Sequence, residues 1–441
     1  MVKLDFVSAI YDKRWNKWLV VFLRFFVGAV FIYSGFVKAI DPWGTVYKFT
    51  DYLMSFHIGG FYQMLPVLAF ALASVEFVFG AFILFGANRK WAPIFLLAMM
   101  AVMLPLTLYL AITDKVADCG CFGDALVISN WTSFWKNVVI TLALVYLLIF
   151  NKNIRGAYSP AVQWLMAIVS LAFIVAIAAT GYFIQPLLDF RPYKVGTPLV
   201  SASQRSAMSM NHDEADDYRF IYEKNGVTRE FSVDSLPDES WKYVDRRELV
   251  KPKAASSSGI SVFDEDDDEV TDSVVPSDGD VLLLLFPNLR SISISYTYLI
   301  NQLNDFAQQH GVGVFGLTSA GKSEIDEWDD LSMASYDIYN IDDSELKMIA
   351  RGNPAVVFVR DGRVVWKRTL RSISSSRLSS IEDLDSLSND FNPAKSLSWL
   401  VSAYFIAMIL VLIINHSHKL VKFTLRRSRK SRNKDVTLHS N

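Results

Sequence analysis

An apolar stretch near the start of the chain sets the class of protein. It reads Trp18-Leu-Val-Val-Phe-Leu-Arg24-Phe-Phe-Val-Gly28-Ala-Val-Phe-Ile-Tyr33-Ser-Gly-Phe-Val-Lys38-Ala-Ile40. An α-helix needs about 20 such residues to cross the hydrocarbon core of a membrane. Further stretches of this kind follow, and 52% of the 441 residues are hydrophobic. We therefore predict a polytopic α-helical membrane protein with about six transmembrane helices. The predicted spans are Trp18–Ile40, Leu65–Phe85, Trp91–Ile112, Phe134–Phe150, Ala161–Leu187 and Leu397–Ile414.

Basic residues predict the orientation of these spans. Lysines and arginines gather in the N-terminal segment, at Arg89 and Lys90, at Lys152 and Arg155, and in the tail 416–441. Six spans place these segments on one side, and short basic segments favour the cytoplasm. We predict a bacterial inner-membrane protein with cytoplasmic termini and a periplasmic soluble domain. The net charge of −2 hides this segregation. We expect the tail to contact anionic membrane lipid and expect no nucleic-acid partner.

The chain has two cysteines, and they lie together in Asp118-Cys119-Gly120-Cys121-Phe122-Gly123-Asp124. On the predicted periplasmic side a disulfide persists. A bridge across one intervening residue closes too small a loop to stabilise the fold much. Gly120 relaxes the backbone, and a small strained ring makes an oxidising, labile disulfide. We favour a redox pair.

Two alternatives to a redox pair stay open. The cysteines are inert or structural thiols, or they form half of a metal site, since two thiolates suit zinc or copper(I). A metal site needs further soft ligands. The outer loops offer mainly His57, with Met54 or Met64 as additional candidates.

Ionisable residues within spans are functional candidates. The candidate quinone or proton contacts are Glu76, Arg24, Tyr33, Ser34 and Lys38. Counting about 1.5 Å per residue places Glu76 near mid-membrane and Arg24 roughly 9 Å deeper. We predict a Glu76–Arg24 pair, which either holds helices together or belongs to a proton path. Lys38 is expected near the outer surface, where it snorkels or lowers the pKa of a cysteine.

The segment 191–280 reads as a hairpin followed by a linker. Asn225-Gly226 separates two alternating runs and suits a two-residue β-turn. Leu249–Asp280 is polar and acidic, and such a run buries too little apolar surface to fold. We predict a disordered linker there. A calcium site in Asp264–Glu269 is the alternative, although the run lacks the spacing of an EF-hand loop.

Residues 281–375 predict a compact α/β domain. Val281–Phe286 is a continuous apolar strand, and the order that follows is helix, strand, helix, proline, strand, turn and strand. This order resembles the thioredoxin fold, and Arg351-Gly-Asn-Pro354 resembles its cis-proline loop. The alternative is a proline that opens a strand. Where that family carries Cys-x-x-Cys, the chain reads Phe286-Pro-Asn-Leu-Arg-Ser-Ile-Ser. The resemblance therefore implies a redox-dead module for binding or scaffolding.

The segment 316–323, Gly-Leu-Thr-Ser-Ala-Gly-Lys-Ser, matches the P-loop pattern and follows a predicted strand. Five acidic residues follow it in Glu324–Asp330, and no later strand ends in an aspartate suited to magnesium. The domain is also predicted to lie outside the cytoplasm. We expect no nucleotide cofactor.

The first 155 residues resemble a known membrane family. The Arg24, Ser34-Gly35 and Lys38 pattern of span one, with Glu76 in span two, resembles the DoxX family. The Cys-Gly-Cys-Phe-Gly run points to its MauE-like branch. The resemblance implies a four-helix bundle with quinone-linked or thiol redox chemistry, and MauE itself is linked to maturation of a disulfide-rich partner. The layout is also similar to vitamin K epoxide reductase homologues, which space their cysteines by two residues.

These patterns predict one organisation. It comprises a DoxX/MauE-like domain (1–155), a fifth span (156–190), a hairpin and linker (191–280), a thioredoxin-like domain (281–375), a sixth span (396–415) and a basic tail (416–441). We predict a thiol–disulfide redox protein, with Cys119 and Cys121 exchanging with a periplasmic thiol protein and a quinone as cofactor. It would be a thiol–disulfide/quinone oxidoreductase. The alternative is a non-catalytic scaffold or assembly factor.

Overall fold

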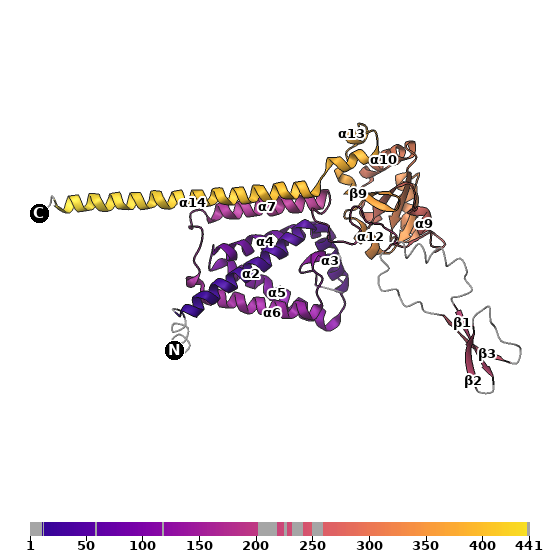
Figure 1. The fold of residues 1–441 in the computed structure, drawn as a ribbon, viewed down its shortest axis with the longest axis horizontal. Helices are drawn as coiled ribbons and strands as arrows, with labels where there is room; N and C mark the ends of the chain where they lie inside the picture. The colour runs from indigo at the N-terminus through magenta and orange to yellow at the C-terminus, as the bar shows by residue number, and fades with distance from the viewer. Residues whose placement is uncertain are drawn as a thin grey trace. The chain divides into compact units, whose positions relative to one another are not determined.

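The computed structural model divides the chain into two compact units, shown in Figure 1. The structure describes residues 11, 13–57, 60–116, 119–201, 218–224, 227–231, 241–248 and 259–438. The membrane unit comprises Met1–Phe190 and Asn389–Asn441, and the α/β unit comprises Arg191–Ser388.

The membrane unit is built from long apolar helices. They are α2 (Arg14–Ile40), α3 (Pro42–Ser55), α4 (Leu65–Phe85), α5 (Trp91–Thr113), α6 (Asn130–Ile149), α7 (Gln163–Phe183) and α14 (Pro393–Leu438). Among the described residues, six helices are long and apolar enough to cross a membrane, which confirms the predicted number of spans. Helix α3 occupies a segment expected to be a loop. It begins because the Asp41 side chain accepts a hydrogen bond from the Gly44 N–H and Pro42 takes a first-turn position.

Small residues set the register between α2 and α4. A Cβ atom on Gly35 would lie 2.6 Å from the carbonyl oxygen of Ala73, and one on Gly28 would lie 2.9 Å from Cβ of Leu84. Both glycines therefore let the two backbones approach closely. This antiparallel register places residues near 35 on α2 opposite residues 73–77 on α4.

Helix α14 packs on α7 within the membrane unit. The Tyr404 ring stacks on Phe173 with centroids 4.4 Å apart, and its hydroxyl lies 3.2 Å from the Ser170 hydroxyl. Near the other end of the span, buried Asn415 accepts a hydrogen bond from the Ser159 N–H and donates one to the Ala157 carbonyl. These contacts join the last helix to the bundle.

The α/β unit holds a mixed sheet of order β4-β7-β6-β5-β8-β9. Strands β5, β6 and β7 are parallel, while β4 pairs antiparallel with β7, β8 with β5, and β9 with β8. The strands are β4 (Val262–Phe263), β5 (Asp280–Phe286), β6 (Gly313–Thr318), β7 (Asp337–Ile341), β8 (Ala355–Arg360) and β9 (Arg363–Thr369). The helices are α9 (Thr271–Val274), α10 (Thr297–Gln309), α11 (Lys322–Ser332), α12 (Asp343–Ile349) and α13 (Ser375–Leu378). The Asn353–Pro354 peptide bond is cis.

The predicted hairpin is confirmed. Strand β1 (Tyr218–Lys224) pairs antiparallel with β2 (Val227–Phe231), and Lys224 lies opposite Val227. A third strand that the sequence did not suggest, β3 (Lys242–Glu248), pairs with the other edge of β1.

The prediction of a disordered linker was wrong for its second half. Ile260, Val262, Val274 and Val275 are fully buried in the core on one face of the large sheet. Apolar residues spaced among the acids are enough to add β4 and α9 to the α/β unit, while the acids between them stay at the surface. The first half of the predicted linker, residues 249–258, lies outside the described residues.

The segment 316–323 differs from a phosphate-binding loop. Gly316 lies inside β6, paired with Leu284 and Ile338, so it opens no loop. Residues 319–321 separate β6 from α11, and the Lys322 ammonium pairs with Glu265 at 2.7 Å. The expectation that the protein uses no nucleotide stays a prediction.

Candidate functional site

Cys119 and Cys121 form a disulfide in the loop between α5 and α6. Their Cα atoms are 5.5 Å apart. Gly120 between them has φ +63°, a left-handed conformation that favours glycine. The two cysteines are 6% and 7% exposed and pack with Leu110 and Val116. The pair is therefore buried.

Helix α3 lies against the cysteine loop. The Tyr52 hydroxyl donates a hydrogen bond of 2.7 Å to the Cys119 carbonyl. The Lys48 side chain packs so closely on Gly120 that an added Cβ would lie 3.0 Å from its Cγ atom. A protein partner therefore needs α3 or the loop to move before it reaches the sulfur atoms.

A buried polar network holds the other side of the loop. The Lys38 ammonium pairs with the Glu76 carboxylate at 2.9 Å, and the two side chains are 5% and 4% exposed. It also donates to the Ser34 hydroxyl and to the Cys121 carbonyl, each at 2.7 Å. Ser34 donates to the same carbonyl at 2.8 Å. An ammonium group has three N–H donors, so a carboxylate, a hydroxyl and a carbonyl use them all.

The predicted Glu76–Arg24 pair was wrong. The glycine contacts of α2 and α4 bring Glu76 level with Lys38. Arg24 lies near Gly86 instead, since a Cβ atom added to Gly86 would be 3.2 Å from Nη1 of Arg24. Arg24 instead donates a 2.8 Å hydrogen bond to the Arg155 carbonyl. The alternative in which Lys38 snorkels was wrong, since Lys38 is 5% exposed; the bundle instead brings it to Cys121, whose carbonyl it binds.

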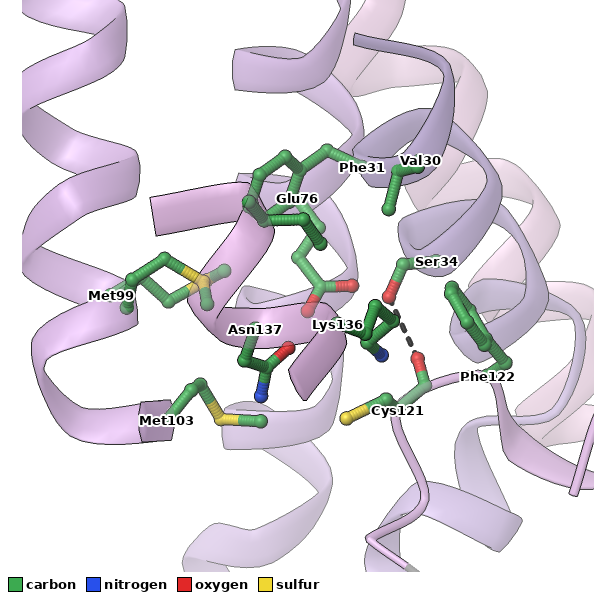
Figure 2. Close-up of a pocket in the computed structure, with 12 residues that line it drawn as sticks. Val30, Phe31, Ser34, Glu76, Met99, Met103, Cys121, Phe122, Lys136 and Asn137 are labelled. Atoms are coloured by element: carbon green, nitrogen blue, oxygen red, sulfur yellow. Dashed lines mark hydrogen bonds between the residues drawn. The ribbon is translucent and has the colours of Figure 1, made fainter. Parts of the chain in front are cut away.

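A small cavity opens beside the disulfide (Figure 2). The space open to the centre of a water molecule measures about 30 Å³, which is room for one or two waters. Figure 2 shows Glu76, Asn137 and Cys121 converging on it from three elements. The lining residues are Val30, Phe31, Ser34, Glu76, Met99, Met100, Met103, Cys121, Phe122, Lys136, Asn137 and Ile140.

The charges around the cavity do not balance. Lys38 and Glu76 neutralise each other, and Lys136 on α6 adds a second cation. The Lys136 ammonium lies 4.1 Å from the centroid of the Phe122 ring. In the part of the chain that the structure describes, Lys136 has no ion-pair partner. Among the cavity-lining residues together with Lys38, the cations therefore outnumber the carboxylates by one while the disulfide is closed.

The structure brings together some of the predicted site residues. Cys121, Ser34 and Glu76 line the cavity, and Lys38 binds all three through its hydrogen bonds to two side chains and one carbonyl. Tyr33 is 43% exposed, and its ring contacts Phe122 from outside the cavity, with centroids 5.5 Å apart.

Sequence reasoning missed Lys136, Asn137 and the methionines. Lys136 lies within the predicted fourth span, so the rule that ionisable residues within spans are candidates would have found it. Asn137 follows it on the same helix, where it donates a 3.3 Å hydrogen bond to Thr107 on α5. No sequence signal distinguishes the methionines from ordinary apolar residues of a span.

The residues proposed as further metal ligands are exposed, whereas the two cysteines are buried. Met54 and Met64 are 62% and 54% exposed, and His57 is exposed as well. Within the described residues, no group of three or more His, Cys, Asp and Glu side chains is placed to hold a metal ion.

These features define a polytopic membrane protein with a buried disulfide beside a charged cavity. Residues 16–150 match the family model described as methylamine utilisation protein MauE, so this region is MauE-like, as its sequence suggested. Residues 217–253, which contain β1, β2 and β3, match a domain of unknown function (DUF8463). Searches of curated proteins and of solved structures found no match.

Proposed function

We propose that the membrane unit is a thiol–disulfide oxidoreductase of a bacterial inner membrane, linked to quinone and facing a periplasmic thiol protein. One observation carries the proposal. The Cys119–Cys121 disulfide borders a cavity that also holds Glu76 and Lys136. Ionisable groups in a membrane protein are costly and mark sites of function. The likeness of residues 16–150 to a methylamine utilisation protein supports maturation of a partner protein as the role.

The residues present fit a quinone head group. The walls are apolar and flexible, since Met99 and Met103 contribute thioethers with several rotatable bonds. Asn137 brings a side-chain amide with two N–H donors, of which one bonds Thr107 and the second suits a carbonyl oxygen. With about 30 Å³ of open space, these methionines must turn aside to admit a ring. A quinone bound there would supply an acceptor for two electrons and two protons.

The chain's own residues handle the thiols and the protons. A dithiol partner reduces the Cys119–Cys121 disulfide and leaves oxidised, and the two cysteines then carry the electron pair as thiols. Glu76 and Lys38 share a hydrogen-bonded network with Ser34 that reaches the carbonyl of Cys121. This network can accept and return protons beside the sulfur atoms. Arg24 and Tyr33 lie outside the cavity, so we leave them out of this role.

The redox state of the pair in cells tests the proposal. Cells are quenched with acid, and free thiols are labelled with a maleimide before and after reduction, with and without quinone depletion. We expect a disulfide in normal cells that becomes a dithiol when quinone is removed. The Cys119→Ser/Cys121→Ser double variant is the control for labelling, and it should reduce disulfide formation in the partner at least a hundredfold. Free thiols under both conditions would exclude the redox function.

A scaffold function is the second candidate, and an observation on the α/β unit favours it. Both cysteines of the chain lie in the membrane unit. The segment that follows β5 contains Asn288 and Ser291. The side-chain amide of Asn353, which precedes the cis proline, donates to the Asn288 carbonyl at 2.8 Å and to the Ser291 hydroxyl at 2.7 Å. We infer a thioredoxin-like module. Asn353 would fix the loop after β5, which is the loop that carries the thiols in redox-active thioredoxin-like proteins.

Complementation separates the two candidates. One variant lacks both cysteines, and a second replaces residues 191–388 with a flexible linker of matched span. Full function of the first variant with loss in the second supports the scaffold. Loss in the first with function in the second supports the oxidoreductase.

A further inference from the structure

We propose that Lys136 stabilises the thiolate of Cys121 when the disulfide opens, which makes Cys119 the sulfur that a thiol partner attacks. The inference rests on the proposed redox function and assigns different roles to the two cysteines. It starts from the excess positive charge beside the disulfide, because a thiolate at Cys121 would neutralise that charge.

Lys136 is the cation available for this role. Lys38 already spends its three donors on Glu76, Ser34 and the Cys121 carbonyl. Lys136 is half-buried, and its ammonium lies over the ring of Phe122, the residue that follows Cys121. Lys136 also lines the same cavity as Cys121. Its attraction to a ring is weaker than its attraction to an anion in a poorly hydrated site. A new thiolate at Cys121 would therefore attract the Lys136 ammonium more strongly than the Phe122 ring does.

The surroundings of the two cysteines also favour Cys119 as the attacked sulfur and Cys121 as the thiolate. The Cys121 carbonyl is fixed by Lys38 and Ser34 on α2, and Cys121 lines the cavity. The Cys119 carbonyl is held by Tyr52 on α3, and Cys119 is not among the cavity-lining residues. A movement of α3 would release the Cys119 carbonyl from Tyr52 and leave the contacts of Cys121 with α2 in place, which favours Cys119 as the attacked sulfur.

The step balances as follows. A thiolate of the partner attacks Sγ of Cys119 and forms a mixed disulfide, and the Cys119–Cys121 bond breaks. The electron pair of that bond stays on Sγ of Cys121 as a thiolate beside Lys136. The partner's second thiol then displaces Cys119, leaving the partner oxidised and Cys119 reduced.

Other titratable groups also surround the pair and set the background for the test. In the described residues they include Lys38 and Tyr33 on α2, Lys48 and Tyr52 on α3, Glu76 on α4, Tyr109 on α5, Lys115 before the cysteine loop, Asp124 just after it and Lys136 on α6. Lys115 provides a matched control. Its ammonium lies 5.8 Å from the Tyr109 ring centroid, and it does not line the cavity.

The reduction potential of the pair tests the role of Lys136. Full-length protein in lipid nanodiscs is equilibrated with thiol redox buffers at pH 7, acid-quenched and alkylated. Lys136→Met should lower the equilibrium constant for reduction about tenfold, which corresponds to a potential about 30 mV more negative. Lys136→Arg should restore it, and Lys115→Met should leave it unchanged. An unchanged potential in Lys136→Met, or equal shifts in all three variants, would overturn the assignment.

Glu76→Gln provides a test with the opposite sign. Removing the carboxylate leaves two cations beside Cys121, so the potential should rise, again by about tenfold in the equilibrium constant. General loosening of the site would move both variants in one direction. Opposite shifts support an electrostatic role, and shifts of the same sign exclude it.

Thiol reactivity closes the test. In Cys119→Ser, the pH dependence of Cys121 alkylation reports the pKa of its thiol, and Lys136→Met should raise that pKa by at least about one unit. The same pair of measurements on Cys121→Ser should show a smaller effect on Cys119, and an equal or larger effect would overturn the assignment. These measurements need neither partner nor quinone. A shifted potential without quinone-linked turnover in cells would therefore refute the proposed function and leave the electrostatic inference standing.

Discussion

The two units hold their buried cations in different ways. In the α/β unit, Lys367 on β9 donates to the carbonyls of Tyr193 and Ile349, and Arg368 donates to the carbonyl of Leu387. In the membrane unit, Lys38 meets a carboxylate and Lys136 faces a cavity beside a disulfide. Cations bound to backbone carbonyls hold strands and loops together. A cation beside a disulfide can stabilise the negative charge that forms when the disulfide is reduced.

The largest expected effect comes from breaking the Lys38–Glu76 pair. Lys38→Met leaves the Glu76 carboxylate buried without its partner, which should cost about 3–5 kcal/mol of stability of the membrane unit. Denaturant titration in mixed micelles measures it. The Lys38→Met/Glu76→Gln double variant should recover much of the loss, because no uncompensated charge remains. If the double variant were as unstable as the single one, packing of Lys38 rather than its charge would explain the effect.

A smaller effect is expected from the matching change in the α/β unit. Lys367→Met leaves the Tyr193 and Ile349 carbonyls without this donor, at a cost of about 1–3 kcal/mol. Hydrogen exchange of β9 in the full-length protein measures it, and Lys347→Met, which loses a surface ion pair with Asp343, should cost no more than about 1 kcal/mol. The disulfide potential should not change in either variant. A change in Lys367→Met would contradict a purely structural role for buried cations of this unit.

The smallest effect concerns Asp329 on α11. Burial first, and then its acidic neighbours Asp326 and Asp330, raise the pKa of this carboxyl. A carboxyl with a raised folded-state pKa adds stability below its unfolded pKa and loses it as the pH rises through the folded value. Because Asp329 is exposed and solvent screens its charge, Asp329→Asn should stabilise the α/β unit by no more than about 0.5 kcal/mol at pH 7 and by nothing near pH 3. Hydrogen exchange at both pH values checks the sign, and a stabilisation confined to pH 3 would reverse the argument.

Local patterns predicted much of the fold. Long apolar runs are sufficient to predict α2, α4, α5, α6, α7 and the apolar part of α14, because a helix in a membrane satisfies its own backbone. The Asn225-Gly226 turn predicted the pairing of β1 with β2 because a two-residue turn fixes the register of its strands. The prediction of a disordered linker before β5 was wrong because it rested on the average polarity of the acidic run. Four residues of this run are apolar and buried in the sheet core.

The candidate site could be predicted only in part. Cys119, Cys121, Glu76 and Lys38 stand out in the sequence as isolated thiols and as charges within apolar spans. Their partners do not. Which charge meets Glu76 depends on how far α2 and α4 are shifted along one another, and the contacts at Gly28 and Gly35 decide that shift.

The amino-acid sequence by itself determined that the chain crosses a membrane with about six helices, and that its two thiols lie in one short loop. Hydropathy and spacing along one chain carry this information because each helix or turn forms from neighbouring residues. The tertiary structure decided that Lys38 rather than Arg24 neutralises Glu76, that α3 covers the disulfide, and that Lys136 shares a cavity with Cys121. These features depend on contacts between helices far apart in the sequence, where close packing of small residues fixes register and rotation.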